Sequence, residues 1–100
     1  MSRVLILHGT TDGHTRKIAD VLGATFREEG CRVDVVDAER VPPLQLDDYD
    51  GAIVAASIHI GDYQRAVRRW VHTHAAWLSR RPSAFLSVCL GVLEYGRERR

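Results

Sequence analysis

Short runs of aliphatic residues punctuate this chain, and each has the length of a buried strand rather than of a buried helix. Uninterrupted apolar runs of this kind are typical of parallel strands that are covered on both faces of a sheet. The second run is rich in valine, a β-branched residue that favours strands. The pattern predicts four strands, at Val4–His8, Arg32–Asp37, Ala52–Ser57 and Ser83–Leu90.

The stretches between these runs have other patterns. Residues 16–29 carry three apolar residues four positions apart, which predicts an amphipathic helix, and Gly30 stands where a helix commonly ends on a glycine. Residues 63–78 show apolar residues at helical spacing with arginines on the other face, which predicts a second helix. Residues 38–50, with adjacent prolines and adjacent aspartates, are expected to form a loop with one helical turn, and residues 58–62 a loop.

Strands that alternate with helices predict an α/β fold with right-handed crossovers and a parallel sheet. At 100 residues the chain has the length of one domain. In such sheets ligands bind at the carboxyl ends of the strands. Those ends are the segments 9–15, 57–62 and 89–92, so the candidate binding residues lie there.

The segment Gly9–Thr15 joins the first strand to the first helix and is a candidate phosphate site. A helix N-terminus offers unpaired backbone N–H groups and the positive end of the helix dipole. The segment is not a nucleotide triphosphatase loop, because three residues separate Gly9 from Gly13 and His14 stands where a lysine is needed. It also lacks the G-x-G-x-x-G pattern of dinucleotide-binding folds. A plain strand-to-helix turn is the alternative interpretation.

The composition excludes several classes of protein. Hydrophobic residues make up 45% and charged residues 27%, as in ordinary soluble domains, and no apolar run approaches the roughly 20 residues that span a bilayer. The N-terminus lacks the features of a signal peptide, so a cytoplasmic location is the expectation. Cys31 and Cys89 match no C-x-x-C pattern and are expected to be reduced thiols. We expect no metal site, since His72 and His74 point to different faces of a helix.

The net charge of +1 is unevenly distributed along the chain. Residues 1–62 hold six basic residues against eleven acidic ones, whereas residues 63–100 hold eight arginines against two glutamates. The basic part could face anionic lipid, an acidic substrate or nucleic acid, or could be a solvated helix face. We expect no nucleic-acid partner, and a peripheral membrane contact through this basic C-terminal part stays open.

Three segments carry a resemblance to one branch of the flavodoxins. Residues 10–15 read TTDGHT and resemble the flavodoxin phosphate loop T-x-T-G-x-T, with Asp12 in place of the second threonine. With an aspartate at that position, the loop resembles that of one branch of the family, the menaquinone-dependent protoporphyrinogen IX dehydrogenases. Residues 56–63, ASIHIGDY, are similar to the second flavin loop of that family, A-S-I-x-Y-G-x-Y, with Ile60 in place of a tyrosine. Residues 82–88, PSAFLSV, are similar to its fourth strand.

The resemblance implies a flavodoxin-like three-layer sandwich and a noncovalently bound FMN. It also implies oxidation of protoporphyrinogen IX to protoporphyrin IX in haem biosynthesis, with electrons passed to a respiratory quinone at the inner face of the membrane. The flavin would supply the redox chemistry and the protein binding, orientation and electrostatics. The implied cofactor-binding residues are Thr10, Thr11, Asp12, Gly13, His14 and Thr15 at the phosphate, and Ser57, Ile58, His59, Ile60, Gly61, Val88, Cys89, Leu90 and Gly91 at the isoalloxazine ring. Asp12 is also expected to cap the helix that follows. No residue is nominated as catalytic.

The chain departs from that family after its fourth strand. We therefore expect a single flavodoxin-like domain over residues 1–100, incomplete at the C-terminus, with sheet order 2-1-3-4 and with the fifth strand and last helix of the family missing. The fourth strand would then be an apolar edge, which invites pairing with a second copy. The alternatives are an inactive truncated remnant, a module that self-associates through this edge, and a small flavodoxin-type electron carrier. Arg65, Arg68 and Arg69 could bind porphyrin propionates or lipid head groups, or could form a solvated face.

Overall fold

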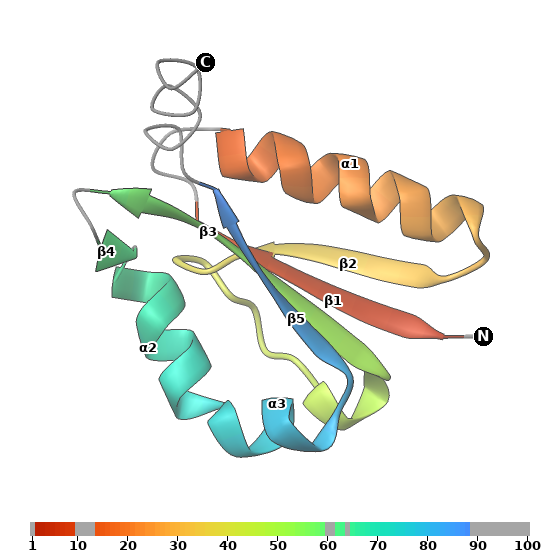
Figure 1. Ribbon diagram of the computed structural model, residues 1–100. Helices are drawn as coiled ribbons and strands as arrows, with labels where there is room; N and C mark the ends of the chain where they lie inside the picture. Colours follow the sequence, from red (N-terminus) through yellow and green to blue (C-terminus); the bar gives the residue numbers. More distant parts are fainter. Residues whose placement is uncertain (1, 10–13, 60–61, 64, 89–100) are drawn as a thin grey trace.

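The computed structural model describes residues 2–9, 14–59, 62–63 and 65–88, which form a sheet with helices on both of its faces (Figure 1). In chain order the elements are β1 (Arg3–His8), α1 (His14–Glu28), β2 (Arg32–Asp37), a 3-10 turn (Leu46–Asp48), β3 (Gly51–His59), β4 (Asp62–Tyr63), α2 (Arg65–Thr73), α3 (Ala75–Arg80) and β5 (Ser83–Val88).

Four of the strands run parallel in the order β2-β1-β3-β5. In β1, Val4 pairs with Val33 of β2 on one side and with Gly51 of β3 on the other. The pairing of β3 with β5 begins at Ala52 and Ser83. Since β5 is the fourth of the predicted strands, the predicted order 2-1-3-4 is confirmed.

The strand β1 lies at the centre of the core because both of its faces are covered. Its residues Leu5–Leu7 are fully buried. Leu7 belongs to the same buried cluster as Trp70 of α2, on one face of the sheet. Ile6 belongs to a second cluster, with Ala19 of α1, on the other face. The continuous aliphatic run therefore has the two-sided burial that the sequence pattern predicts.

The helix α1 has the predicted C-terminal cap and begins two residues earlier than predicted. Gly30 adopts a φ of +90°, a left-handed conformation that glycine reaches without strain. The Gly30 N–H donates to the Arg27 carbonyl and the Cys31 N–H donates to the Phe26 carbonyl, each at 3.0 Å. This pair of hydrogen bonds is a Schellman motif, which satisfies carbonyls that the end of a helix leaves free.

The prediction of a loop over residues 58–62 is wrong at both ends. The strand β3 continues to His59, and Ile58 and His59 pair antiparallel with Tyr63 and Asp62 of β4. A connection of two residues between paired positions is the length that favours a tight hairpin. The hydrogen bonds of this local pairing outweigh the loop preference that the composition indicates.

The predicted second helix is divided at His74, which has φ −109° and ψ 21°. Its N–H still bonds the Trp70 carbonyl at 3.0 Å, and its carbonyl accepts from the Leu78 N–H at 3.0 Å. The chain thus turns without losing these helical bonds, and both Trp70 and Trp77 remain buried. The sequence does not reveal the bend, because two tryptophans seven residues apart also fit one straight helix. None of the helices in the described ranges is long and apolar enough to cross a bilayer.

The long connection between β2 and β3 covers the sheet beside α2 and α3. The predicted helical turn is the 3-10 turn at Leu46–Asp48. Four aliphatic side chains anchor the connection by packing against the cluster that contains Trp70. They are Ala38, Val41, Leu44 and Leu46.

Candidate functional site

The carboxyl ends of β1, β3 and β5 meet at one edge of the sheet, here called the carboxyl edge. His8, the last residue of β1, pairs with Ala55 of β3, and Ser57 of β3 pairs with Val88, the last residue of β5. Beyond β1, the Gly9 N–H donates to the Ala55 carbonyl at 3.3 Å. The segment that follows β1 therefore leaves the sheet directly beside β3.

The connections that follow β1 and β3 go to opposite faces of the sheet (Figure 1). The helix α1 follows β1 and packs on the face of Ile6, whereas α2 and α3 follow β3 and pack on the face of Leu7. In parallel α/β sheets, ligands bind outside the carboxyl ends of the strands at such a switch point. The boundary between β1 and β3 at the carboxyl edge is therefore the candidate ligand site.

The predicted site residues divide into two groups. At the carboxyl edge the structure places His14 and Thr15 as the first two residues of α1, Ser57–His59 as the last three of β3, and Val88 as the last of β5. The other predicted residues lie outside the described residues, and they are Thr10, Thr11, Asp12, Gly13, Ile60, Gly61, Cys89, Leu90 and Gly91. The sheet thus brings one part of each predicted segment to the same edge, and the proposed cap by Asp12 stays a prediction.

The start of α1 suits an anionic group. Its first turn contains no acidic residue and carries Arg16 and Lys17 next to the fully buried Thr15. Cations at a helix N-terminus are unfavourable by themselves, since the dipole is positive there, and a bound anion would offset that cost. Arg16 is also paired with Asp20, with 3.9 Å between Nε and Oδ2. The first turn of α1 is therefore compatible with a bound anion, as the sequence predicts.

A buried histidine, which sequence reasoning did not assign to the site, supports the first segment. His8 is 4% exposed, and its Nδ1 lies 3.1 Å from the Gly9 carbonyl. In the tautomer with the proton on Nδ1, the ring donates to that carbonyl. The Ala38 N–H donates to the His8 carbonyl at 2.8 Å, which ties the end of β2 to the same point. His8 therefore fixes the backbone at the place where the candidate phosphate segment begins.

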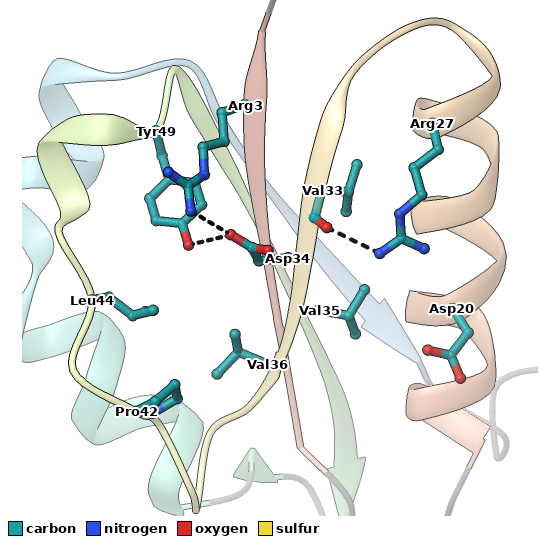
Figure 2. Close-up of a pocket in the computed structure, with 10 residues that line it drawn as sticks. All are labelled: Arg3, Asp20, Arg27, Val33, Asp34, Val35, Val36, Pro42, Leu44 and Tyr49. Carbon is teal, nitrogen blue, oxygen red and sulfur yellow. Dashed lines mark hydrogen bonds and ion pairs between the residues drawn. The ribbon is translucent and has the colours of Figure 1, made fainter.

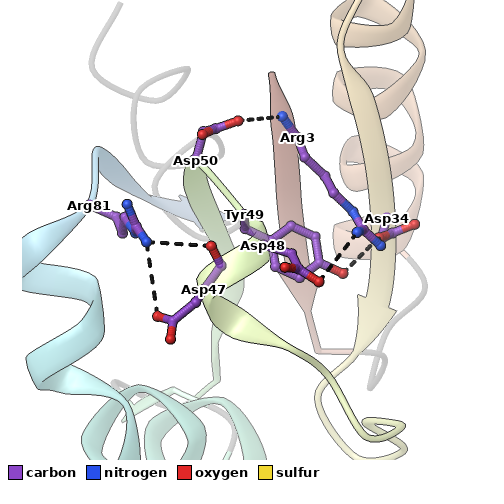
Figure 3. A network of polar contacts seen from close by, with 7 residues as sticks. All are labelled: Arg3, Asp34, Asp47, Asp48, Tyr49, Asp50 and Arg81. Atoms are coloured by element: carbon purple, nitrogen blue, oxygen red, sulfur yellow. Dashed lines mark hydrogen bonds and ion pairs between the residues drawn. The ribbon is translucent and has the colours of Figure 1, made fainter. Parts of the chain in front are cut away.

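A polar cluster joins β1, β2 and the segment before β3 at the opposite, amino edge of the sheet (Figure 3). The Tyr49 hydroxyl donates to Asp34 Oδ2 at 2.6 Å, and the Arg3 guanidinium donates to the same oxygen at 3.1 Å. The guanidinium carbon lies 4.8 Å from the centroid of the Tyr49 ring. The backbone N–H of Arg3 also donates to the Asp50 carboxylate at 2.9 Å.

These contacts shift the pKa values of the three side chains. The hydrogen bond from Tyr49, with further help from Arg3, lowers the pKa of the Asp34 carboxyl. Burial, followed by the hydrogen bond to Asp34, raises the pKa of Tyr49 to about 12. The hydrogen bond to Asp34 raises the pKa of Arg3 above its ordinary value. At neutral pH the cluster therefore consists of a carboxylate, a phenol and a guanidinium. Because it lies at the amino edge, away from the candidate ligand site, we interpret it as a cluster that stabilises the fold.

The outer side of β2 is closed by an arginine from α1. Figure 2 shows this side, where a hollow of about 460 Å³ has Arg27 on one side of the strand and Asp34 on the other. The Arg27 guanidinium donates to the Val33 carbonyl at 3.0 Å. That carbonyl faces away from β1, because the neighbouring Arg32 N–H bonds the Ser2 carbonyl on the β1 side at 2.8 Å. Arg27 thus occupies an outward-facing carbonyl of β2 that could otherwise accept a hydrogen bond from an added strand.

Comparisons with known sequences agree with the architecture. The profile of the flavodoxin domain family matches residues 5–98. The chain is 41% identical over 88 residues to protoporphyrinogen IX dehydrogenase [quinone] of Escherichia coli K12, a match that covers 88% of this chain and 49% of that protein. It is 39% identical over 89 residues to the protein of the same name from Leishmania major, covering 88% of this chain and 38% of that protein. The chain therefore spans at most about half the length of these curated relatives.

Solved structures give the same fold. A flavodoxin from Streptococcus pneumoniae TIGR4 superposes with a TM-score of 0.63 at 25% identity, covering 71% of this chain and 50% of that one. A flavodoxin from the domain Archaea superposes with a TM-score of 0.68 at 11% identity, covering 87% and 84%. The parallel order β2-β1-β3-β5, the helices on both faces and the match of the family profile over most of the sequence lead to one conclusion. The chain belongs to the flavodoxin domain family.

Proposed function

We propose that the chain binds FMN at the carboxyl edge and serves as an FMN-dependent oxidoreductase domain that acts on protoporphyrinogen IX. Identity of 41% to a protein named protoporphyrinogen IX dehydrogenase [quinone] is the observation that carries this proposal. The geometry supports it, because α1 begins beside the end of β1 with two cations and no acid in its first turn.

Different predicted residues would contact different parts of the cofactor. Residues 10–15 would hold the phosphate at the N-terminus of α1, and residues 57–61 and 88–91 would flank the isoalloxazine ring at the ends of β3 and β5. When bound, the flavin would supply the redox chemistry between a reduced tetrapyrrole and a quinone. The protein binds and orients both partners, and His8 holds the backbone at the entrance of the phosphate segment.

Cofactor binding is tested with the purified chain, freed of flavin and titrated with FMN and with riboflavin while flavin fluorescence is followed. Because the phosphate is the proposed anchor, FMN should bind at least about tenfold more tightly than riboflavin, as expected for the loss of charge-assisted hydrogen bonds. The double variant Thr10→Ala with Gly13→Val should lose this preference. Thr25→Ala is the matched control, since Thr25 is exposed and its hydroxyl donates to the Val21 carbonyl within α1. Equal affinity for FMN and riboflavin would remove the phosphate assignment.

Activity is tested separately by incubating the FMN-loaded chain with protoporphyrinogen IX and a soluble quinone without oxygen. The expected result is the appearance of porphyrin fluorescence that depends on both the protein and the quinone. Tight FMN binding without porphyrin formation would refute the dehydrogenase proposal and favour the alternatives of an electron carrier or an inactive flavodoxin-like remnant.

A further inference from the structure

A groove of about 410 Å³ runs between α2 and the turn that follows β2. Its walls combine apolar and aromatic side chains with one arginine and one glutamate, and are formed by Ala38, Glu39, Val41, Ala66, Arg69, Trp70, Thr73 and His74. The rings of Trp70 and His74 are stacked at an angle, with 4.5 Å between their centroids. A volume of this size lies within the range of small-molecule sites, most of which combine apolar walls with a few polar groups.

Both walls of the groove start from the carboxyl edge. On one side, the Ala38 N–H bonds the carbonyl of His8, the last residue of β1. On the other side, α2 begins two residues after Tyr63, which pairs with Ile58 near the end of β3. A molecule in the groove could therefore reach the edge at which the flavin is proposed to bind.

The first five residues of α2 include three arginines, Arg65, Arg68 and Arg69, and the helix contains no acidic residue. Arginines three and four positions apart lie on the same side of a helix and repel each other, and the positive end of the dipole adds to the repulsion. Arg65 and Arg69 are exposed, and neither has a carboxylate within ion-pair distance among residues 2–9, 14–59, 62–63 and 65–88. The arrangement costs helix stability, and an anionic ligand would offset that cost.

We propose that this groove binds the tetrapyrrole substrate, with its apolar ring system along Ala66 and Trp70 and its propionate carboxylates on Arg65 and Arg69. The inference rests on the proposed function, since it names where the substrate of that function would bind. Guanidinium groups form paired, charge-assisted hydrogen bonds with carboxylates, which gives orientation as well as affinity. Glu39, which also lines the groove, offers an acceptor for the pyrrole N–H groups of the ligand.

The shape of the site favours this ligand over a membrane surface or a nucleic acid. The cation Arg69 lines a groove that also has apolar and aromatic walls at Ala66 and Trp70, as an amphipathic anion requires, whereas a bilayer or a nucleic acid is contacted by a broad basic surface. Further along the same side of the fold, Arg81 of the segment after α3 is already engaged, because its guanidinium lies 3.9 Å from the Asp47 carboxylate and donates to the Asp47 carbonyl at 3.4 Å (Figure 3).

The experiment uses the stable oxidised product, protoporphyrin IX, and its dimethyl ester, titrated into the purified chain while tryptophan fluorescence is followed. The free acid should bind at least about tenfold more tightly than the ester, which lacks both charges. Arg69→Ala should weaken binding of the free acid by about tenfold and leave binding of the ester unchanged. Arg69→Lys should restore part of the affinity because it keeps the charge. Arg32→Ala, an exposed arginine at the start of β2, is the matched control and should have no effect.

Each alternative has its own outcome. Equal affinity for the acid and the ester, or equal effects of Arg69→Ala and Arg32→Ala, would overturn the assignment. Binding to phosphatidylglycerol vesicles could depend on Arg69 while porphyrin affinity is unchanged in Arg69→Ala. That outcome would assign the arginine to lipid binding and overturn the porphyrin assignment. A parallel FMN titration separates the two proposals, because failure to bind FMN with intact Arg69-dependent porphyrin binding refutes the proposed function alone. Far-ultraviolet circular dichroism confirms that each variant is folded.

Discussion

Replacing Tyr49 by phenylalanine tests whether the polar cluster at the amino edge stabilises the fold. The substitution removes one hydroxyl and keeps the ring, which is 2% exposed and belongs to the buried cluster around Leu7. The hydroxyl donates to Asp34 Oδ2 at 2.6 Å, and the same carboxylate keeps its contact with Arg3 at 3.1 Å in the variant. The variant therefore loses one hydrogen bond and little packing.

The pKa of the phenol sets an upper limit to the size of the effect. A pKa of about 12 instead of 10.0 means that folding favours the phenol over the phenolate by about 2.7 kcal/mol, and burial of the phenolate accounts for more of this than the hydrogen bond to Asp34 does. The Asp34 side chain is 43% exposed, so solvent screens the interaction and can hydrate the carboxylate in the variant. We expect Tyr49→Phe to lower the free energy of unfolding by about 1–1.5 kcal/mol at pH 7, in line with hydrogen bonds to charged groups.

The stabilisation by the Tyr49 phenol should depend on pH. Because the pKa of Tyr49 is higher in the folded than in the unfolded state, the folded chain holds more protons between about pH 10 and pH 12, and stability falls as the pH rises. The contribution of the phenol is complete below about pH 10 and is lost as the pH passes about 12. The difference in stability between wild type and Tyr49→Phe should therefore shrink over this interval.

Urea unfolding followed by tryptophan fluorescence measures both effects, at pH 7 and at steps up to pH 11. The control is a double-mutant cycle with Asp34→Asn, which cancels the titration of other tyrosines and of lysine. In the Asp34→Asn background the effect of Tyr49→Phe should fall well below its effect in the wild type. A change below about 0.3 kcal/mol at pH 7, or an equal change in both backgrounds, would refute the reasoning.

Three further substitutions test the backbone and the sheet edge by thermal unfolding. Gly51→Ala should lower stability by about 1–3 kcal/mol, because a Cβ at this position would lie 2.8 Å from the Pro82 carbonyl oxygen, and an unchanged melting temperature would contradict the close approach of β3 to the start of β5. Gly30→Ala should cost about 1–2 kcal/mol through backbone strain alone, since φ is +90° and no atom lies within 4 Å of the added Cβ, and Gly30→Asn should cost less. Arg27→Met keeps much of the side-chain length but frees the Val33 carbonyl, so it should increase concentration-dependent association in sedimentation velocity; no change would show that the guanidinium does not protect the edge.

The positions of the strands could be predicted from the sequence because each aliphatic run has a local cause, whereas their order was implied by the resemblance to the flavodoxins. Residues Leu5–Leu7 are buried on both faces of β1, and such burial leaves an uninterrupted apolar pattern that does not depend on distant partners. Gly30 was equally predictable, since the left-handed end of α1 needs a glycine whatever surrounds it.

The features that escaped prediction depend on tertiary contacts. Arg3, Asp34 and Tyr49 are far apart in the sequence and meet only when β1 and β2 pair in the observed register. The bend at His74 keeps its hydrogen bonds to Trp70 and Leu78, so the apolar periodicity carries no trace of it.

The candidate site was predictable at the level of segments. The carboxyl ends of parallel strands share an edge whatever the side chains, which is why the ends of β1, β3 and β5 could be grouped in advance. The positions of individual side chains in the loops depend on backbone conformation that hydrophobic patterning does not encode. The groove at Arg69 could not be predicted from the sequence either, because it forms only where α2 packs beside the turn after β2.

The two outer strands of the sheet have opposite properties. β2 presents a carbonyl that is occupied by Arg27, and the polar side chain of Asp34 lies on the same strand. β5 reads SAFLSV, with neither charge nor proline, and among the described residues its only strand partner is β3. Among the described residues, β2 therefore carries features that oppose the addition of a further strand, and β5 carries none.

This asymmetry limits how copies of the chain could associate. We propose that any pairing between copies through β5 joins two identical edges about a two-fold axis, and the β2 edges, where Arg27 occupies the Val33 carbonyl, then face outward. Association of this kind stops at the dimer instead of propagating into a filament. Sedimentation velocity over a wide concentration range would show a ceiling at twice the monomer mass, and a continuous series of larger species would contradict the proposal.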